Sequence, residues 1–131
     1  MSKIIEGLKY TPDHEWIKKI SDTEALIGIT DFAQGELGEL VYIEVDTVGK
    51  TLERHAIFGI VEAVKTTSDL FLPVDGKILE MNKAISDKGG NNPGLLNADP
   101  YGEGWIIRIE MTNPSDWDSL LEGNQYAELI K

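Results

Sequence analysis

A lysine inside an apolar stretch is the first residue whose position suggests chemistry. The stretch IVEAVKTTSDLFLPVDG, residues 60–76, reads as a strand, a tight reversal and a second strand, with Lys65 at the reversal. Its neighbours Val64 and Thr66 are short and β-branched, so the amine should project into water. A solvated amine is a poor nucleophile or general base, because those roles need a buried or electropositive site. Exposure alone is typical of an ordinary surface lysine, but it also suits modification by another enzyme.

Three further carboxylates lie close to the lysine in the sequence or in the segment near the N-terminus. Asp69 follows the lysine by four residues, and Asp13 and Glu15 lie in the segment KYTPDHEW, residues 9–16. Acidic residues are rarely fully buried unless they are paired. Taken alone, the sequence therefore favours ordinary solvated acids at these positions.

The histidines do not complete a catalytic or metal site. His14 and Trp16 of the HEW triplet are predicted to pack within their segment, and the triplet alone is no metal motif. His55 lies in no motif and is assigned no role. A small hydrolase that used His14, Glu15 and Asp69 would need a nucleophile and a base in one cleft. The sequence offers no such constellation, so neither a catalytic residue nor a metal site is predicted.

The composition limits the class of protein. A chain of 131 residues with 41% hydrophobic residues predicts one compact domain, residues 1–131. The net charge of -11, from 23 acidic and 12 basic residues, would repel nucleic acid phosphates and acidic membrane surfaces. The absence of cysteine excludes disulfides and fits a reducing compartment. No signal peptide core or membrane-spanning segment is found, so a cytoplasmic protein without nucleic acid or membrane partners is expected.

Short strands must position these candidate residues. The run 105–111 alternates apolar and polar residues, as a half-buried strand requires. The run 57–64 is apolar on both faces apart from Glu62, which predicts a central strand buried on two sides. The predicted strands together span residues 24–30, 40–45, 57–64, 70–74, 77–82 and 105–111.

The predicted helices are short and peripheral. Thr30 or Asp31 can cap a helix of about two turns that ends at Gly38. Near the C-terminus, Gly123 is expected to end one short helix and Asn124 to cap the last one.

Two further features concern the connections. Residues 86–104 are rich in Gly, Asn and Pro, which predicts a long surface connection with one helical turn. GKTLE, residues 49–53, and GKILE, residues 76–80, share four of five positions on opposite sides of the lysine. Two related halves of a quasi-symmetric sandwich would show such an echo.

The stretch GIVEAVKTTSD, residues 59–69, resembles the lipoylation site of the glycine cleavage system H-protein family. Five stretches in register make the resemblance specific, and it covers about residues 8–130. The resemblance implies a mainly β fold, a lipoyl-type β-sandwich or flattened barrel (barrel-sandwich hybrid) with short peripheral helices and a C-terminal helix. The other four stretches are KYTPDHEW (9–16), IGITDFAQGELGELVYIEV (27–45), LPVDGKILEMN (72–82) and LNADPYGEGWIIRIE (96–110).

The resemblance implies a carrier and not an enzyme. In the family the equivalent of Lys65 bears lipoate in amide linkage, which adds a flexible arm ending in a dithiolane. The arm receives an aminomethyl group from glycine decarboxylase, a pyridoxal phosphate enzyme, and delivers it to aminomethyltransferase, which uses tetrahydrofolate. Dihydrolipoyl dehydrogenase then reoxidises the arm with FAD and NAD. Lipoate-attaching enzymes are further expected partners, and the carrier is expected to be a monomer.

A cleft for the loaded arm is also implied by the resemblance. Carried over to this chain, Glu15 and Asp69 are the carboxylates that hold the protonated amine, with Asp13 nearby. The chain departs from the family pattern at Ala63, where Ser is common, and at Thr66, where Ala is common. Both side chains are small, so neither should block a lipoylating enzyme.

Other carrier roles remain open at this point. A related lipoyl carrier could pass lipoate to 2-oxo acid dehydrogenases or act in sulfur oxidation. A biotin carrier also uses a hairpin lysine, but its usual signature places methionines beside the lysine, and here the neighbours are Val64 and Thr66. A purely structural adaptor would leave Lys65 unmodified.

Overall fold

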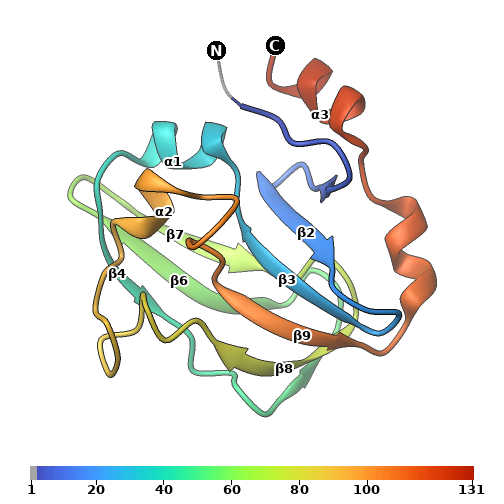
Figure 1. Ribbon diagram of the computed structural model, residues 1–131, viewed down its shortest axis with the longest axis horizontal. Helices are drawn as coiled ribbons and strands as arrows, with labels where there is room; N and C mark the ends of the chain where they lie inside the picture. Colours follow the sequence, from blue (N-terminus) through green and yellow to red (C-terminus); the bar gives the residue numbers. More distant parts are fainter. Residues whose placement is uncertain (1–2) are drawn as a thin grey trace.

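Two antiparallel β-sheets form the body of the molecule (Figure 1). The computed structural model describes residues 3–131. The larger sheet has 6 strands in the order β1-β2-β3-β9-β8-β5, and the smaller has 3 in the order β4-β6-β7. The strands span Lys9–Tyr10 (β1), Glu15–Lys19 (β2), Glu24–Ile29 (β3), Leu40–Glu44 (β4), Thr51–Leu52 (β5), Ile57–Ala63 (β6), Thr67–Phe71 (β7), Gly76–Met81 (β8) and Ile107–Met111 (β9).

Apolar side chains of both sheets meet in one core. Ile27 and Ile107 of the larger sheet and Val61 of the smaller sheet are each 0% exposed and belong to the same cluster. Alternation along each strand sends every second side chain to this side. The two sheets pack as a sandwich and do not close into a barrel, which confirms the predicted mainly β, lipoyl-type fold.

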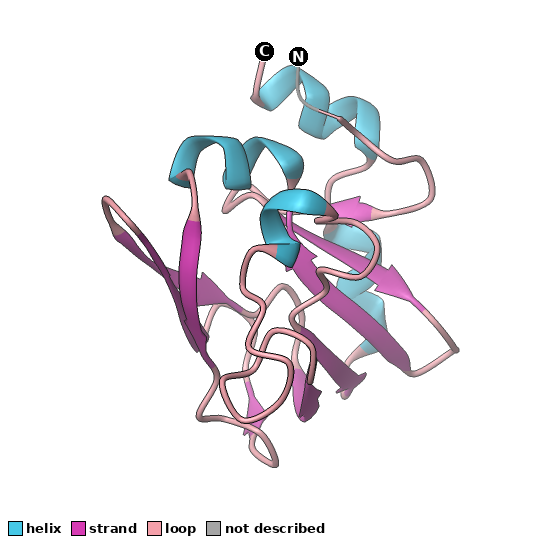
Figure 2. Cartoon of the chain, turned by 60° about the vertical axis from the view of Figure 1, so that its left-hand side comes forward, coloured by secondary structure: helices cyan, strands magenta, loops and turns pink. Residues whose placement is uncertain are grey.

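The helices cover the sandwich and add little to its core. Figure 2 shows them mainly on the side of the strands where both chain ends lie. Thr30 caps α1 as predicted, because its hydroxyl accepts the Ala33 N–H, and Gly38 ends the helix at φ 79. The helices span Asp31–Leu37 (α1), Leu95–Ala98 (α2) and Gly123–Leu129 (α3), with a 3-10 helix at Pro114–Ser119 (η1).

The predicted strand 57–64 is central in its sheet but is buried on one face only. Ile57 is 49% exposed, whereas Phe58 and Val61 are buried. No other element within residues 3–131 buries the opposite face of β6 to the same extent. The prediction of a strand buried on two sides, which rested on its apolar side chains, is therefore wrong. The next strand, β7, begins at Thr67, three residues before the predicted start, since polar residues in it face outward.

The C-terminal helix begins two residues earlier than predicted, at Gly123. Gly123 is the first residue of α3 and does not end a helix, because η1 stops at Ser119. Glu122 is the N-cap, and its side chain and that of Gln125 form a reciprocal capping box. Asn124 therefore lies within the first turn and is not the cap.

The two similar segments, 49–53 and 76–80, pair with each other as neighbouring strands. In β5 and β8, Thr51 is opposite Lys77 and Leu52 is opposite Gly76. The single turn α2 in residues 86–104 also agrees with the prediction. The short strands β1, β2 and β5 were not predicted. None of the helices within residues 3–131 has the length and apolar character that a membrane crossing requires.

Candidate functional site

Lys65 lies at the tip of the hairpin that joins β6 to β7. The Ala63 N–H donates to the Thr66 carbonyl over 2.7 Å and closes the turn. Val64 is 69% exposed, and Lys65 beside it is exposed as well. No carboxylate in the described part of the chain forms an ion pair with this lysine. The amine is therefore presented to solvent on two paired strands, as predicted.

Glu15, at the start of β2, is buried instead of solvated. Its side chain bridges the two sheets, because Oε2 accepts the Phe71 N–H of β7 over 2.7 Å. β7 is an edge strand, so this N–H has no strand partner on that side. Glu15 is 2% exposed, and its other oxygen, Oε1, has no hydrogen-bond partner among residues 3–131.

Burial raises the pKa of the Glu15 carboxyl well above its ordinary value of 4.5. The hydrogen bond from Phe71 opposes this shift, since it favours the charged form, and the nearby charge of Asp13 adds to it. A carboxyl with one unpartnered oxygen and a second acid beside it is poised to accept a cationic partner.

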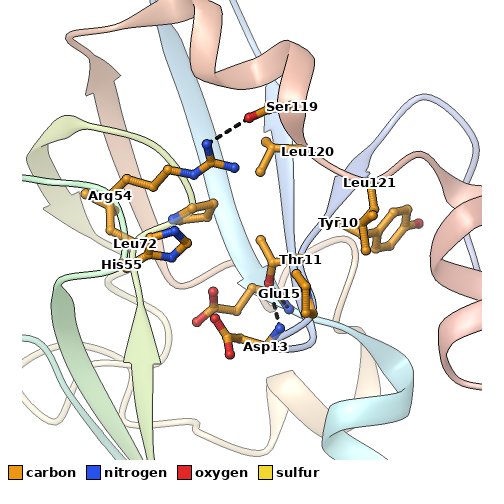
Figure 3. Close-up of a pocket in the computed structure, with 12 residues that line it drawn as sticks. Tyr10, Thr11, Asp13, Glu15, Arg54, His55, Leu72, Ser119, Leu120 and Leu121 are labelled. Atoms are coloured by element: carbon orange, nitrogen blue, oxygen red, sulfur yellow. Dashed lines mark hydrogen bonds between the residues drawn. The ribbon is translucent and has the colours of Figure 1, made fainter.

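A cavity of about 210 Å³ adjoins this carboxyl. Figure 3 shows the carboxylates of Asp13 and Glu15 close together on one wall of it. Thr11 holds this wall in place, because its hydroxyl accepts the Asp13 N–H over 3.2 Å. The full lining consists of Tyr10, Thr11, Pro12, Asp13, Glu15, Arg54, His55, Leu72, Pro73, Ser119, Leu120 and Leu121.

Two basic side chains from the β5–β6 connection complete the cavity. Arg54 donates from Nη1 to the Ser119 hydroxyl over 2.8 Å, while its buried Nε has no partner among the described residues. His55 has a left-handed backbone with φ 74, a conformation that costs energy for a residue other than glycine. The cavity thus has acids on one wall and basic groups on another.

Asp69 does not line the cavity that Glu15 adjoins. It is exposed and lies opposite Ile60 in the β6–β7 ladder, and it alternates with the buried Leu70. Its side chain therefore faces the outer surface of the smaller sheet. The structure brings Glu15 and Asp13 together, and it places Asp69 on β7, which spans Thr67–Phe71.

His14 and Trp16 pack as predicted. Trp16 is 1% exposed, and its indole N–H donates to the Pro100 carbonyl over 2.9 Å. Burial lowers the pKa of His14, against the opposing charges of Asp13 and Glu36. The His14 Nδ1 lies 2.9 Å from the Tyr126 hydroxyl. His14 therefore ties the acidic segment to α3.

Replacing Tyr126 with Phe should destabilise the protein by about 1–3 kcal/mol, because buried polar groups lose a partner. The Tyr126 hydroxyl lies 2.7 Å from Thr30 Oγ1 as well as near His14. Chemical denaturation would measure the change. Glu128→Gln, on the same helix but with a side chain 75% exposed, is the control and should shift stability by less than about 0.5 kcal/mol. Equal stability of the two variants would contradict the proposed tie.

Glu15→Gln should alter the pH dependence of stability. Because the folded pKa of Glu15 is above the unfolded value of 4.5, the folded state holds the proton longer. Wild-type stability should fall as pH rises from that value to the folded pKa, by up to about 1.4 kcal/mol per pH unit. The Gln variant lacks this titration, so its stability relative to wild type should increase over the same window. Chemical denaturation of both proteins at a series of pH values is the measurement. If the pKa of the Glu15 carboxyl were not raised on folding, the curves of stability against pH for wild type and Glu15→Gln would be parallel over this window.

Comparison with known proteins shows the family of this chain. A family model described as "Glycine cleavage H-protein" matches residues 8–131. The chain belongs to the glycine cleavage H-protein family. It is 48% identical over 128 residues to the glycine cleavage system H protein of Chlorobaculum tepidum, with 97% of each chain covered. It is 46% identical over 125 residues to that of Bacteroides fragilis, with 95% of each covered. The crystal structure of the Mycobacterium marinum protein gives a TM-score of 0.84 at 35% identity and covers 95% of this chain and 97% of that one.

H-protein family membership accounts for the absence of a catalytic constellation. The family carries lipoate covalently on a lysine and acts in glycine cleavage as a non-catalytic lipoyl carrier, and this chain has that role. The enzymes of the glycine cleavage system are the partners of this family. The residues of this chain fit such a group, because Lys65 is exposed and free of ion pairs.

Sequence reasoning missed three groups of the site. Arg54 and His55 line the cavity, and the Phe71 N–H holds Glu15. His55 had no motif to mark it, and a backbone N–H carries no side-chain signal. The sequence signal that could have indicated the cavity is the adjacent basic pair Arg54 and His55. This pair directly follows the segment 49–53.

Proposed function

We propose that Lys65 is the residue that carries lipoate. The observation that supports this proposal is a solvated amine at the tip of a closed hairpin, in a chain whose family attaches lipoate to a lysine. The paired strands fix where the amine is presented, and the exposed Val64 beside it leaves room for an attaching enzyme. When attached, lipoate supplies a disulfide that can be reduced and loaded with an aminomethyl group.

Glu15 and Asp13 receive the amine of the aminomethyl cargo. Glu15 lines the cavity, its Oε1 has no hydrogen-bond partner among the described residues, and Asp13 on the same wall adds a second carboxylate. A neighbouring carboxylate favours the protonated amine. Protonation occupies the nitrogen lone pair, and that lone pair is what expels sulfur and exposes the carbon to water. The two acids therefore protect the cargo during transit.

Asp69 has a separate role from the cavity acids. It lies on the outer face of β7, between Lys65 and the Phe71 N–H that holds Glu15. A carboxylate in this position attracts a cation that moves along the strand, and its solvent exposure makes the attraction weak. Asp69 contributes to the approach of the cargo amine, and Glu15 contributes to its retention.

The carrier docks with three enzymes in turn. Glycine decarboxylase loads it, aminomethyltransferase unloads it, and dihydrolipoyl dehydrogenase restores the disulfide. The net charge of -11 can speed encounter with basic docking patches. A monomer in the cytoplasm suits successive docking, because one exposed hairpin must be presented to each enzyme.

Mass spectrometry of the protein from a lipoate-replete native host tests this assignment. Intact mass should show one lipoyl group, and peptide mapping should place it on Lys65. The exposed Lys77 of β8 serves as an internal control and should be unmodified. A biotinyl group, or an unmodified Lys65, would overturn the proposal.

A further inference from the structure

The unpartnered oxygen of Glu15 is the most unusual polar group in the described part of the chain. Glu15 is 2% exposed, its carboxyl oxygen Oε2 accepts the Phe71 N–H, and Oε1 has no hydrogen-bond partner in residues 3–131. No basic side chain there forms an ion pair with it. A buried carboxylate without a counter-charge is costly, and such groups usually take up a proton instead.

The other charged groups of the cavity do not remove this cost. Asp13, beside Glu15, carries the same charge and disfavours ionisation. Arg54 lines the cavity but directs its guanidinium to Ser119, and His55 lies on the same connection. Tyr10, from β1, lines the cavity as well, and its pKa is raised by burial, so it adds no charge.

We propose that Glu15 is a neutral acid when the cavity is empty, and that it gives its proton to the cargo amine when the amine docks. This inference rests on the proposed function, and it identifies Glu15 as the source of the proton that the carboxylate–ammonium pair requires. The same side chain then serves as the proton donor on arrival and as the counter-ion during storage.

The proton transfer from Glu15 to the amine needs no further reactant. The O–H bond at Glu15 Oε1 breaks, an N–H bond forms on the neutral amine, and the products are a carboxylate and an ammonium in contact. An amine that arrives already protonated leaves the Glu15 proton to solvent instead. On departure of the cargo as a free amine the proton returns to Oε1. The opposite charges appear together, so neither is left uncompensated in the cavity.

Two consequences follow for the cargo. When the amine arrives neutral, its lone pair is occupied by a proton that Glu15 supplies inside the cavity, so protection of that form does not depend on a proton from bulk water. The empty carrier also avoids the cost of an isolated buried charge. An exposed carboxylate could offer the cargo amine only a screened attraction, which explains why Glu15 is buried and Asp69 is not.

Carbon-13 NMR of the protein labelled at glutamate carboxyl carbons tests the proposal. The Glu15 signal is identified by its loss in Glu15→Gln, with Glu53→Gln, an exposed neighbour of Arg54, as the matched control. At pH 7 the Glu15 carboxyl should be protonated in the unloaded protein and ionised in the aminomethyl-loaded protein. The Glu53 signal should be the same in both.

The outcomes separate this inference from the function on which it rests. An ionised Glu15 in the unloaded protein overturns the inference, even if the cargo still depends on Glu15 for its lifetime. A Glu15 that is protonated in both states shows that the amine docks elsewhere, which overturns both the inference and the assignment of Glu15 to the cargo. A carboxyl that changes from protonated to ionised on loading supports the inference.

Discussion

Lys65→Arg is expected to abolish glycine decarboxylation and exchange in a reconstituted system while leaving the fold intact. Arginine keeps the positive charge but has no amine that can form the amide to lipoate. The side chain is exposed and unpaired, so the free energy of unfolding should change by less than about 0.5 kcal/mol. Activity assays with the partner enzymes and circular dichroism would measure the two effects.

A matched lysine distinguishes loss of the attachment site from loss of positive charge. Lys77 is exposed on β8, away from the hairpin, and Lys77→Arg should retain full lipoylation and activity. Activity that survived in Lys65→Arg would refute the assignment of the arm to this residue. Loss of activity together with loss of the circular dichroism signal would instead show that the hairpin needs this lysine for folding.

Glu15→Ala is expected to leave lipoylation intact and to shorten the lifetime of the loaded protein by about 10- to 100-fold, since a charged hydrogen bond contributes about 1.5–3 kcal/mol. Lipoylation should not change, because Lys65 lies at the hairpin tip and does not line the cavity. The rate of ammonia release from the isolated loaded protein is the measurement.

Removal of the whole side chain also removes the acceptor for the Phe71 N–H. Glu15→Gln controls for this second effect, since its amide oxygen can still accept that hydrogen bond. If charge retains the cargo, Ala and Gln should shorten the lifetime similarly, and Asp69→Asn should do so much less. A normal lifetime in Glu15→Gln would show that the carboxylate is not what holds the amine.

Local features of the sequence predicted the parts of the site that depend on neighbours in the chain. The hairpin around Lys65 and the cap at Thr30 require only turn and capping preferences within a few residues. The single helical turn in 86–104 follows from the same kind of signal. The strands β1 and β5, of 2 residues each, are too short to show a period.

The burial of Glu15 could not be predicted in this way. Its hydrogen bond to the Phe71 N–H joins residues 56 positions apart, and it depends on how the two sheets meet. The separation of Asp69 from the cavity has the same origin, because it depends on the face of β7 that each residue occupies. The family resemblance grouped these two acids, whereas the strand geometry assigns them to different surfaces.

The hydrogen bond between Glu15 and Phe71 also bears on self-association. An exposed edge strand offers free N–H groups to the backbone of another chain, and proteins commonly cover such edges to avoid aggregation. Here a side chain from the opposite sheet occupies the N–H of Phe71 on the edge strand β7. The residue that we assign to the cargo therefore also blocks one point of intermolecular strand pairing, and a side chain that cannot accept a hydrogen bond at this position would leave that N–H open.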